Sequence, residues 1–231
     1  MTHTPVKAII WDLDGTIIHF KIDYIRARRS AIKILKKHGI PKINLTIKKS
    51  IFENVGTAKD IFKSMGFNNE KIDNILKKID REVDNIELEA AKIATMINGI
   101  DQVLDFAKRK SLKQAIYTLN TSQNARISLE KVNLLKYFDI IVGRDNVDNP
   151  KPHPDHLIFI CDKINVDPSE ILVIGDTSRD IEGALNAGAR SVAIHTKISR
   201  ITNMEIFRKA NKIINEYEIP SALIEAIKEF L

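Results

Sequence analysis

Two aspartates stand one residue apart where an apolar run near the start of the chain ends. The run covers residues 6–11, and Asp12, Asp14 and Gly15 come soon after it. This pattern predicts a buried strand that delivers two carboxylates to a tight turn. Carboxylates this close raise each other's pKa unless a cation lies between them. The stretch therefore indicates a bound metal, a shared proton, or both.

Further polar side chains follow two other apolar runs. Thr118 ends the run at 112–118, where a hydroxyl beside backbone N–H groups can bind a phosphate oxygen, although such a threonine also begins ordinary turns. Asp176 and Asp180 follow the run at 171–175, and their spacing lets both face one point above a sheet. Asp180 suits the first turn of a helix equally well, because an acid there complements the helix dipole.

One lysine lies in an unusually restricted segment. Lys151 has a proline on each side, and three prolines occur within residues 150–154. Proline restricts its own backbone and that of the residue before it, so the segment is extended and holds one ammonium group with little freedom. An ordinary loop lysine is the alternative interpretation.

These residues can meet only if the strands that carry them share one edge of a sheet. Helical and strand patterns alternate after about residue 100, which predicts right-handed crossovers and a parallel sheet covered on both faces. Such sheets bind ligands at the carboxyl ends of their strands. The expected helices are 101–110, 123–134, 155–164, 180–187 and one from 221, and the expected strands are 112–118, 138–143, 171–175, 191–195 and 212–214.

The stretch between the first strand and this alternating region predicts an all-helical insert. Apolar residues recur at helical spacing from Tyr24 to a stop at His38 and Gly39, and again from Asn69 to about Ala94. A short helix is expected at 57–66, with Thr57 as its cap. The predicted division is a discontinuous α/β core of residues 1–18 and 96–231 and a helical domain of residues 19–95.

Together the candidate residues describe one kind of chemistry. Four carboxylates beside one lysine are electrostatically untenable without a hard divalent cation, and all-oxygen ligands favour Mg2+ over zinc or copper. A site with Mg2+, a lysine and a hydroxyl can bind a phosphate dianion, and a carboxylate there can attack it. The set is Asp12, Asp14, Thr118, Lys151, Asp176 and Asp180.

The order and spacing of these motifs resemble the haloacid dehalogenase-like (HAD) superfamily, within it the phosphoglycolate phosphatase-like group with a helical cap. The resemblance implies a three-layer Rossmann-like α/β core with a mainly parallel sheet, and a cap formed by the insert. It also implies a Mg2+-dependent phosphatase that acts on a small phosphorylated metabolite, such as phosphoglycolate or a sugar phosphate. Dehalogenases of this superfamily lack an acid at the position of Asp14, so its presence argues against dehalogenation.

The resemblance also assigns roles. Asp12 would be the nucleophile that forms an aspartyl-phosphate, and Asp14 would be the general acid and base. The metal would be held by the Asp12 carboxylate, the Asp14 carbonyl and Asp176, with Asp180 helping directly or through water. Transition-state charge would be stabilised by two further residues that bind the phosphoryl oxygens. These are Thr118 and Lys151.

Two further residues are predicted to bind substrate. Leu119 stands where many relatives have asparagine, so Asn120 is the candidate amide in the phosphate loop, although it then points differently. Lys59, in an expected turn at residues 56–59, is the candidate for an anionic part of the substrate, with an ordinary surface lysine as the alternative.

Two other functions fit the same motifs. A beta-phosphoglucomutase-like phosphosugar mutase shares all the core residues and needs a cap that retains a bisphosphate intermediate. A non-catalytic binding protein on the same fold is the third possibility, but such a protein has no reason to keep four costly carboxylates together.

Composition sets the remaining expectations. The 231 residues carry a net charge of +6, but the lysines are spread over amphipathic segments, which indicates solvated helix faces rather than a nucleic-acid site. No apolar stretch is long enough to span a membrane, and no signal-peptide pattern opens the chain. The single cysteine, Cys161, fits a helix core in a reducing compartment. We expect a cytoplasmic enzyme, monomeric or a small homo-oligomer.

Overall fold

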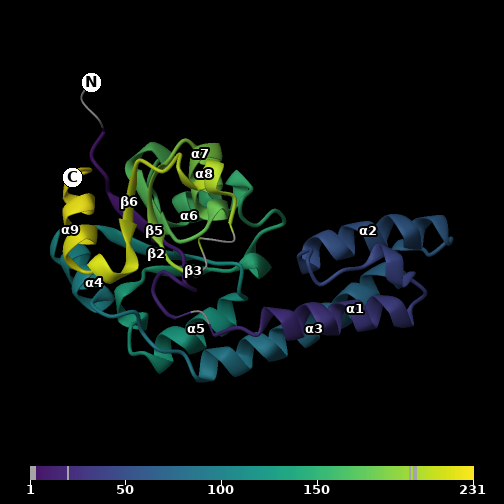
Figure 1. The fold of residues 1–231 in the computed structure, drawn as a ribbon. Coiled ribbons are helices and arrows are strands. Elements are labelled where there is room, and N and C mark those ends of the chain that lie inside the picture. The colour runs from purple at the N-terminus through teal and green to yellow at the C-terminus, as the bar shows by residue number, and fades with distance from the viewer. Residues whose placement is uncertain (1–3, 20, 198, 200–201) are drawn as a thin grey trace. The chain divides into compact units, whose positions relative to one another are not determined.

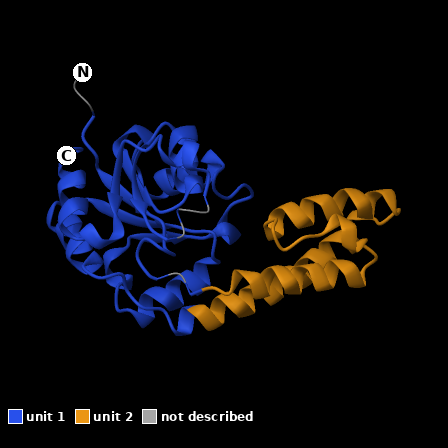
Figure 2. Cartoon of the chain, viewed as in Figure 1, with its two compact units in different colours: residues 1–21, 91–231 blue, residues 22–90 orange. Residues whose placement is uncertain are grey.

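The computed structural model describes residues 4–19, 21–197, 199 and 202–231. The chain divides into two compact units (Figure 2). Unit 1 contains residues 1–21 and 91–231, and unit 2 contains residues 22–90. Each unit is built around a hydrophobic core of its own.

A six-stranded sheet forms the centre of unit 1 (Figure 1). Its strand order is β3-β2-β1-β4-β5-β6, and every neighbouring pair is parallel. The predicted parallel α/β fold is therefore confirmed. The strands are β1 (Ala8–Trp11), β2 (Lys113–Tyr117), β3 (Ile140–Val142), β4 (Ile171–Gly175), β5 (Arg190–His195) and β6 (Lys212–Asn215).

Helices cover both faces of this sheet. The alternation of side chains along β1 explains why its whole sequence is apolar. Ile9 and Trp11 belong to the core cluster on one face, and Ala8 and Ile10 belong to the cluster on the other. The first face is covered by α4 (Ile100–Arg109), α5 (Ser122–Lys131) and α9 (Ser221–Lys228), and the second by α6 (Pro154–Ile164), α7 (Ser178–Ala187) and α8 (Met204–Phe207).

Strand β1 lies where the chain order of the sheet reverses. It pairs with β2 on one side and with β4 on the other. The crossovers on its two sides lead to opposite edges of the sheet, and parallel sheets bind ligands at such a reversal, at the carboxyl edge of the strands. The residues after β1, β2 and β4 therefore meet at this edge.

Unit 2 is a bundle of three helices: α1 (Tyr24–Lys37), α2 (Ile51–Ser64) and α3 (Asn69–Lys92). Leu35, Phe62 and Ile79, one from each helix, are buried in its core. No helix in the described part of the chain is long and apolar enough to cross a membrane. That residues 19–95 act as a cap stays a prediction.

The start of α2 differs from the expected helix at 57–66. Ser50 caps it, because its side chain accepts a hydrogen bond from the Glu53 N–H while the Glu53 carboxylate accepts one from the Ser50 N–H. This reciprocal cap fixes the first turn at Ile51. Thr57 and Lys59 consequently lie inside the helix, and the expected turn at residues 56–59 is wrong.

A buried asparagine shapes the loop before α2. The side chain of Asn54 is 1% exposed. It donates to the carbonyls of Thr46 at 2.9 Å, Lys49 at 3.3 Å and Ser50 at 2.8 Å, and it accepts from the Thr46 N–H at 3.0 Å. Arg28 holds the carbonyl of Ile47 at 3.0 Å. Two side chains outside the loop 46–50 therefore hold its backbone in place.

Replacing Asn54→Ala is expected to lower the free energy of unfolding by about 1–3 kcal/mol, because it leaves buried backbone groups without partners. Urea unfolding followed by circular dichroism measures the loss. Asn44→Ala, at an exposed position, is the matched control and should stay within about 0.5 kcal/mol of the wild type. Equal effects of the two changes would contradict this account of the loop.

Candidate active site at the carboxyl end of the sheet

Asp12 continues strand β1 into the site. Its N–H donates to the carbonyl of Ile174 at 2.8 Å, so the ladder between β1 and β4 extends one residue beyond the strand. The residue is 6% exposed. Rigid strand backbone thus fixes the carboxylate, which is the placement that precise chemistry needs.

The turn after Asp12 depends on a glycine. Gly15 has a φ of +93°, a conformation that side chains with a Cβ rarely adopt. A Cβ atom there would lie 2.2 Å from Oδ2 of Asp176. Gly15 therefore lets the loop after β1 approach the carboxylate that follows β4.

Lys151 links segments at the carboxyl ends of three strands. Its ammonium group donates to the Asp12 carboxylate, to Oδ1 of Asp180 at 2.7 Å and to the carbonyl of Tyr117 at 2.8 Å. It also lies 4.4 Å from the centre of the Tyr117 ring. The side chain is 3% exposed, so all three of its donors are used inside the protein.

Three buried carboxylates lie close together here, and two of them, Asp12 and Asp180, contact the ammonium group. Oxygen atoms of Asp12, Asp176 and Asp180 all lie within 4.8 Å of one another. Oδ1 of Asp176 is buried and has no hydrogen-bond partner in the part of the chain that the structure describes. One ammonium cannot balance three carboxylates, and an unpartnered buried oxygen is costly. This donor set fits a hard divalent cation, which prefers oxygen ligands.

Burial dominates the electrostatics of the cluster. It raises the pKa of Asp12 to about 6, although Lys151 opposes the shift. Burial and the charges of Asp12 and Asp180 raise the pKa of Asp176 well above its ordinary value. Burial alone would lower the pKa of Lys151, but Asp12 and Asp180 outweigh it and the pKa rises. The ammonium group therefore stays charged.

The structure places Asp180 both in the first turn of α7 and beside Lys151, and its part in holding a metal stays a prediction. Its Oδ2 accepts from the N–H and the hydroxyl of Thr177, at 2.9 and 2.6 Å, which closes the first turn of α7. Its other oxygen holds Lys151. The helix-start acid and the site acid are therefore one residue, because the two oxygens face different partners.

The loop after β2 connects the remaining candidates. Thr118 is 1% exposed, and its hydroxyl accepts from the Asn120 N–H at 3.1 Å. The Asn120 side chain donates to Oδ2 of Asp14 at 2.6 Å. The structure thus brings Asn120 to the proposed acid, a contact that the sequence analysis did not predict.

Lys59 is the one candidate outside unit 1. It is exposed on α2 in unit 2, and its contact with substrate stays a prediction. Cys161 is buried in α6, where burial raises the pKa of its thiol to about 12, so its core role is confirmed.

The sequence analysis missed two residues that support the site. Thr196 follows β5 at the same sheet edge, and its hydroxyl donates to Oδ2 of Asp176 at 3.1 Å. The criterion that identified the other candidates, a polar residue after an apolar strand, could also have identified Thr196. His156 accepts from the Lys151 N–H at 3.3 Å and lies 3.1 Å from the Val142 carbonyl. Burial and Lys151 lower its pKa to about 4, so the ring stays neutral.

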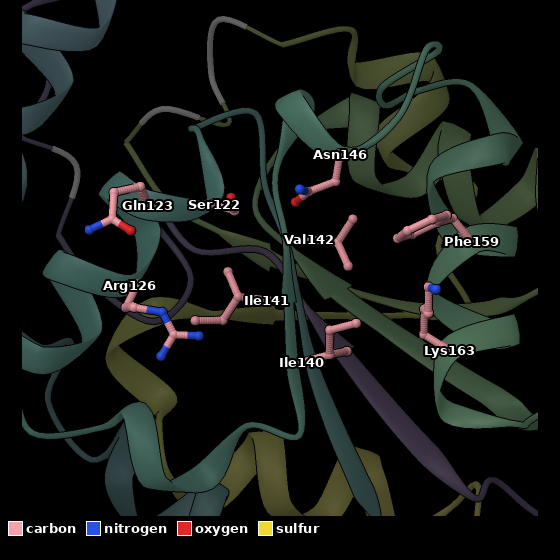
Figure 3. A pocket seen from close by; sticks show the side chains of 9 residues that line it. All are labelled: Ser122, Gln123, Arg126, Ile140, Ile141, Val142, Asn146, Phe159 and Lys163. Carbon is pink, nitrogen blue, oxygen red and sulfur yellow. The ribbon is translucent and has the colours of Figure 1, made fainter.

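A hollow of about 260 Å3 lies elsewhere, at the free edge of β3 (Figure 3). Arg126 and Gln123 line it on one side of the strand, and Phe159 and Lys163 line it on the other. None of the carboxylates described above borders it. The hollow is therefore a feature of the sheet edge and not part of the candidate site.

This α/β core with its buried carboxylates and lysine defines the class of protein. A sequence model of the haloacid dehalogenase-like hydrolase family matches residues 9–194, and the chain belongs to this family. The match confirms the resemblance inferred from the motifs.

Several individual proteins are similar to the chain. A phosphorylated carbohydrates phosphatase of Thermotoga maritima is 25% identical over 187 residues, which cover 81% of this chain and 84% of that protein. A phosphoglycolate phosphatase of Shigella dysenteriae is 24% identical over 213 residues, covering 82% and 81%. The crystal structure of a beta-phosphoglucomutase from Clostridium difficile superposes with a TM-score of 0.67 at 21% identity and covers 97% of both chains, which shows the shared fold.

Gly15→Ala is expected to destabilise the protein more than Gly188→Ala. Both glycines have positive φ, which costs a residue with a Cβ about 1–2 kcal/mol, but only Gly15 also faces a carboxylate at 2.2 Å. Nothing lies within 4 Å of a Cβ at Gly188. Urea unfolding of both variants measures the difference, and equal losses would contradict the close approach to Asp176.

The raised pKa of Asp12 gives a pH dependence of defined sign. The folded state binds this proton more tightly than the unfolded state, so Asp12 stabilises the fold below its ordinary pKa of 3.8 and loses that effect as the pH rises through about 6. In protein treated with a chelator, the stability of the wild type relative to Asp12→Asn should therefore fall from pH 4 to pH 7. A relative stability that rises over this range would refute the shift.

Proposed function

We propose that the protein is a Mg2+-dependent phosphatase that hydrolyses a small phosphorylated metabolite through an aspartyl-phosphate on Asp12. One observation carries the proposal: three buried carboxylates and the Lys151 ammonium converge at the carboxyl end of β1, beside an unpartnered oxygen of Asp176. A carboxylate nucleophile, a cation site and a fixed positive charge are the parts that phosphoryl transfer needs.

Four residues are proposed to hold the metal. Carboxylates of Asp12, Asp176 and Asp180 and the backbone carbonyl of Asp14 supply oxygen ligands of the kind that Mg2+ prefers. When bound, the ion neutralises charge on the phosphoryl oxygens and lowers the repulsion between phosphate and carboxylate. Lys151 and Thr118 bind the same phosphoryl group, Lys151 by charge and Thr118 by its hydroxyl and backbone.

The first step transfers the phosphoryl group to the protein. An oxygen of Asp12 forms a bond to phosphorus while the bond from phosphorus to the ester oxygen breaks. The leaving alkoxide takes a proton from Asp14, so the alcohol departs neutral. Lys151 holds the Asp12 carboxylate in place from the side, which reduces its rotation before attack.

The second step returns Asp12 to its starting state. Asp14, now ionised, takes a proton from water while the water oxygen attacks phosphorus. The bond between phosphorus and Asp12 breaks, inorganic phosphate is released, and Asp14 is protonated again. The same carboxyl group therefore serves as acid and then as base.

The relatives support the substrate class. Curated relatives are named for phosphorylated carbohydrates and for phosphoglycolate, both small phosphate monoesters. Substrate binding by Lys59, a cytoplasmic location, and a monomer or small homo-oligomer stay predictions. Substrate binding by Asn120 is untested, and the contact of its amide with Asp14 favours another role.

Asp12→Asn is expected to lower the release of p-nitrophenol from p-nitrophenyl phosphate by at least about 10³-fold, because the amide is not a competent nucleophile. Wild-type activity should require Mg2+ and disappear with a chelator. Asp162→Asn, the same change at an exposed position on α6, is the control and should retain activity.

Two results would overturn the assignment: a metal-independent wild type, or an Asp12→Asn enzyme with full activity. A panel of phosphoglycolate, sugar phosphates and nucleotides then defines the substrate. Incubation with beta-glucose 1-phosphate and a catalytic amount of its bisphosphate distinguishes a phosphosugar mutase from a phosphatase. A mutase forms glucose 6-phosphate without net release of phosphate.

A further inference from the structure

Asn120 is fixed at three points in the loop after β2. Its N–H donates to the Thr118 hydroxyl at 3.1 Å, and its carbonyl accepts from the Arg144 N–H at 3.1 Å. Gly143 permits this approach, because a Cβ there would lie 2.5 Å from the Asn120 carbonyl oxygen. The residue is 6% exposed. These contacts therefore fix the backbone from which the side-chain amide projects.

The third point is the contact with Asp14. The Asn120 amide donates to Oδ2 of Asp14 at 2.6 Å and so connects the loop after β2 to the loop after β1. This bond restricts the rotation of the Asp14 carboxyl group and so contributes to the direction in which its other oxygen faces. Proton transfer depends steeply on that direction, because donor and acceptor must be within hydrogen-bond reach.

We infer that Asn120 is the positioning residue for Asp14 and not a contact of the substrate; the inference rests on the proposed function. An amide suits this task because it donates a hydrogen bond without carrying a charge or changing its protonation. A lysine or arginine at this position would pair permanently with the carboxylate and oppose its protonation.

The residue before Asn120 also holds the loop through its backbone. This residue is Leu119, and Arg144 donates to the Leu119 carbonyl at 2.6 Å. The loop is thus held by its backbone at Leu119 and Asn120, and the asparagine side chain remains available for Asp14. In this chain the amide that follows Leu119 contacts the proposed acid.

The test uses a series of aryl phosphates whose phenols range from good to poor leaving groups, p-nitrophenyl phosphate to phenyl phosphate. A poor leaving group needs protonation more than a good one does. We expect Asn120→Ala to lower kcat about 10-fold to 100-fold more for phenyl phosphate than for p-nitrophenyl phosphate, with KM changed less than about 3-fold. Asn120→Leu, of similar shape but without a donor or a charge, should give the same selective loss and covers the case in which the alanine variant folds poorly.

A double-mutant cycle separates positioning from a merely structural role. If Asn120 acts through Asp14, then Asn120→Ala adds no further loss in the Asp14→Asn background. The matched control is Asn44→Ala, the exposed asparagine already used as a control for Asn54, whose kcat ratio between the two esters should equal that of the wild type.

Each other outcome overturns the inference. Equal losses on both esters, additive losses in the cycle, or a raised KM with unchanged kcat would make Asn120 a structural residue or a substrate contact. These results leave the phosphatase itself intact. A wild type that hydrolyses no ester in the presence of Mg2+ would instead overturn the proposed function, and this inference with it.

Discussion

The site depends on one buried ammonium group. Lys151 donates to Asp12 and Asp180 and to the carbonyl that ends β2, so a single side chain joins the segments after three strands. Removing one member of such a buried set would leave an uncompensated charge, which is far more costly than a missing surface ion pair. The two prolines beside Lys151 and the neutral ring of His156 hold its backbone. Much of the local sequence therefore serves to place one nitrogen atom.

The balance of charge around Lys151 explains why its neighbours have unlike environments. Asp180 divides its oxygens between the ammonium group and the first turn of α7, whereas Asp176 keeps one buried oxygen without a partner. The pKa values of Asp12 and Asp176 are raised because both carboxyl groups are buried near other carboxylates, which reflects the excess of buried negative charge. A divalent cation of the kind proposed would complete this arrangement, because it would offset the excess of buried carboxylate charge.

The sequence predicted which residues lie together because each directly follows a strand of the sheet. It did not predict contacts that depend on how two distant loops are arranged. Asp12, Thr118 and Asp176 come together because parallel strands share one carboxyl edge, and that rule needs no coordinates. The contact between Asn120 and Asp14 depends on the course of two loops that are 106 residues apart, which no local pattern contains. The start of α2 was a different failure: Ser50 and Glu53 form a capping box that was visible in the sequence and was overlooked.

In the loop before α2, the residues that set the backbone conformation are not the residues exposed at its surface. Asn54 and Arg28 hold its backbone from outside, while Lys48 and Lys49 are exposed and contribute no side-chain bond to its form. Substitutions at these exposed positions therefore change surface chemistry at little conformational cost, whereas a change at Asn54 removes its hydrogen bonds to Thr46, Lys49 and Ser50. In a mutational library, residues 47–49 are consequently the places to diversify, and Asn54 is the residue to keep constant.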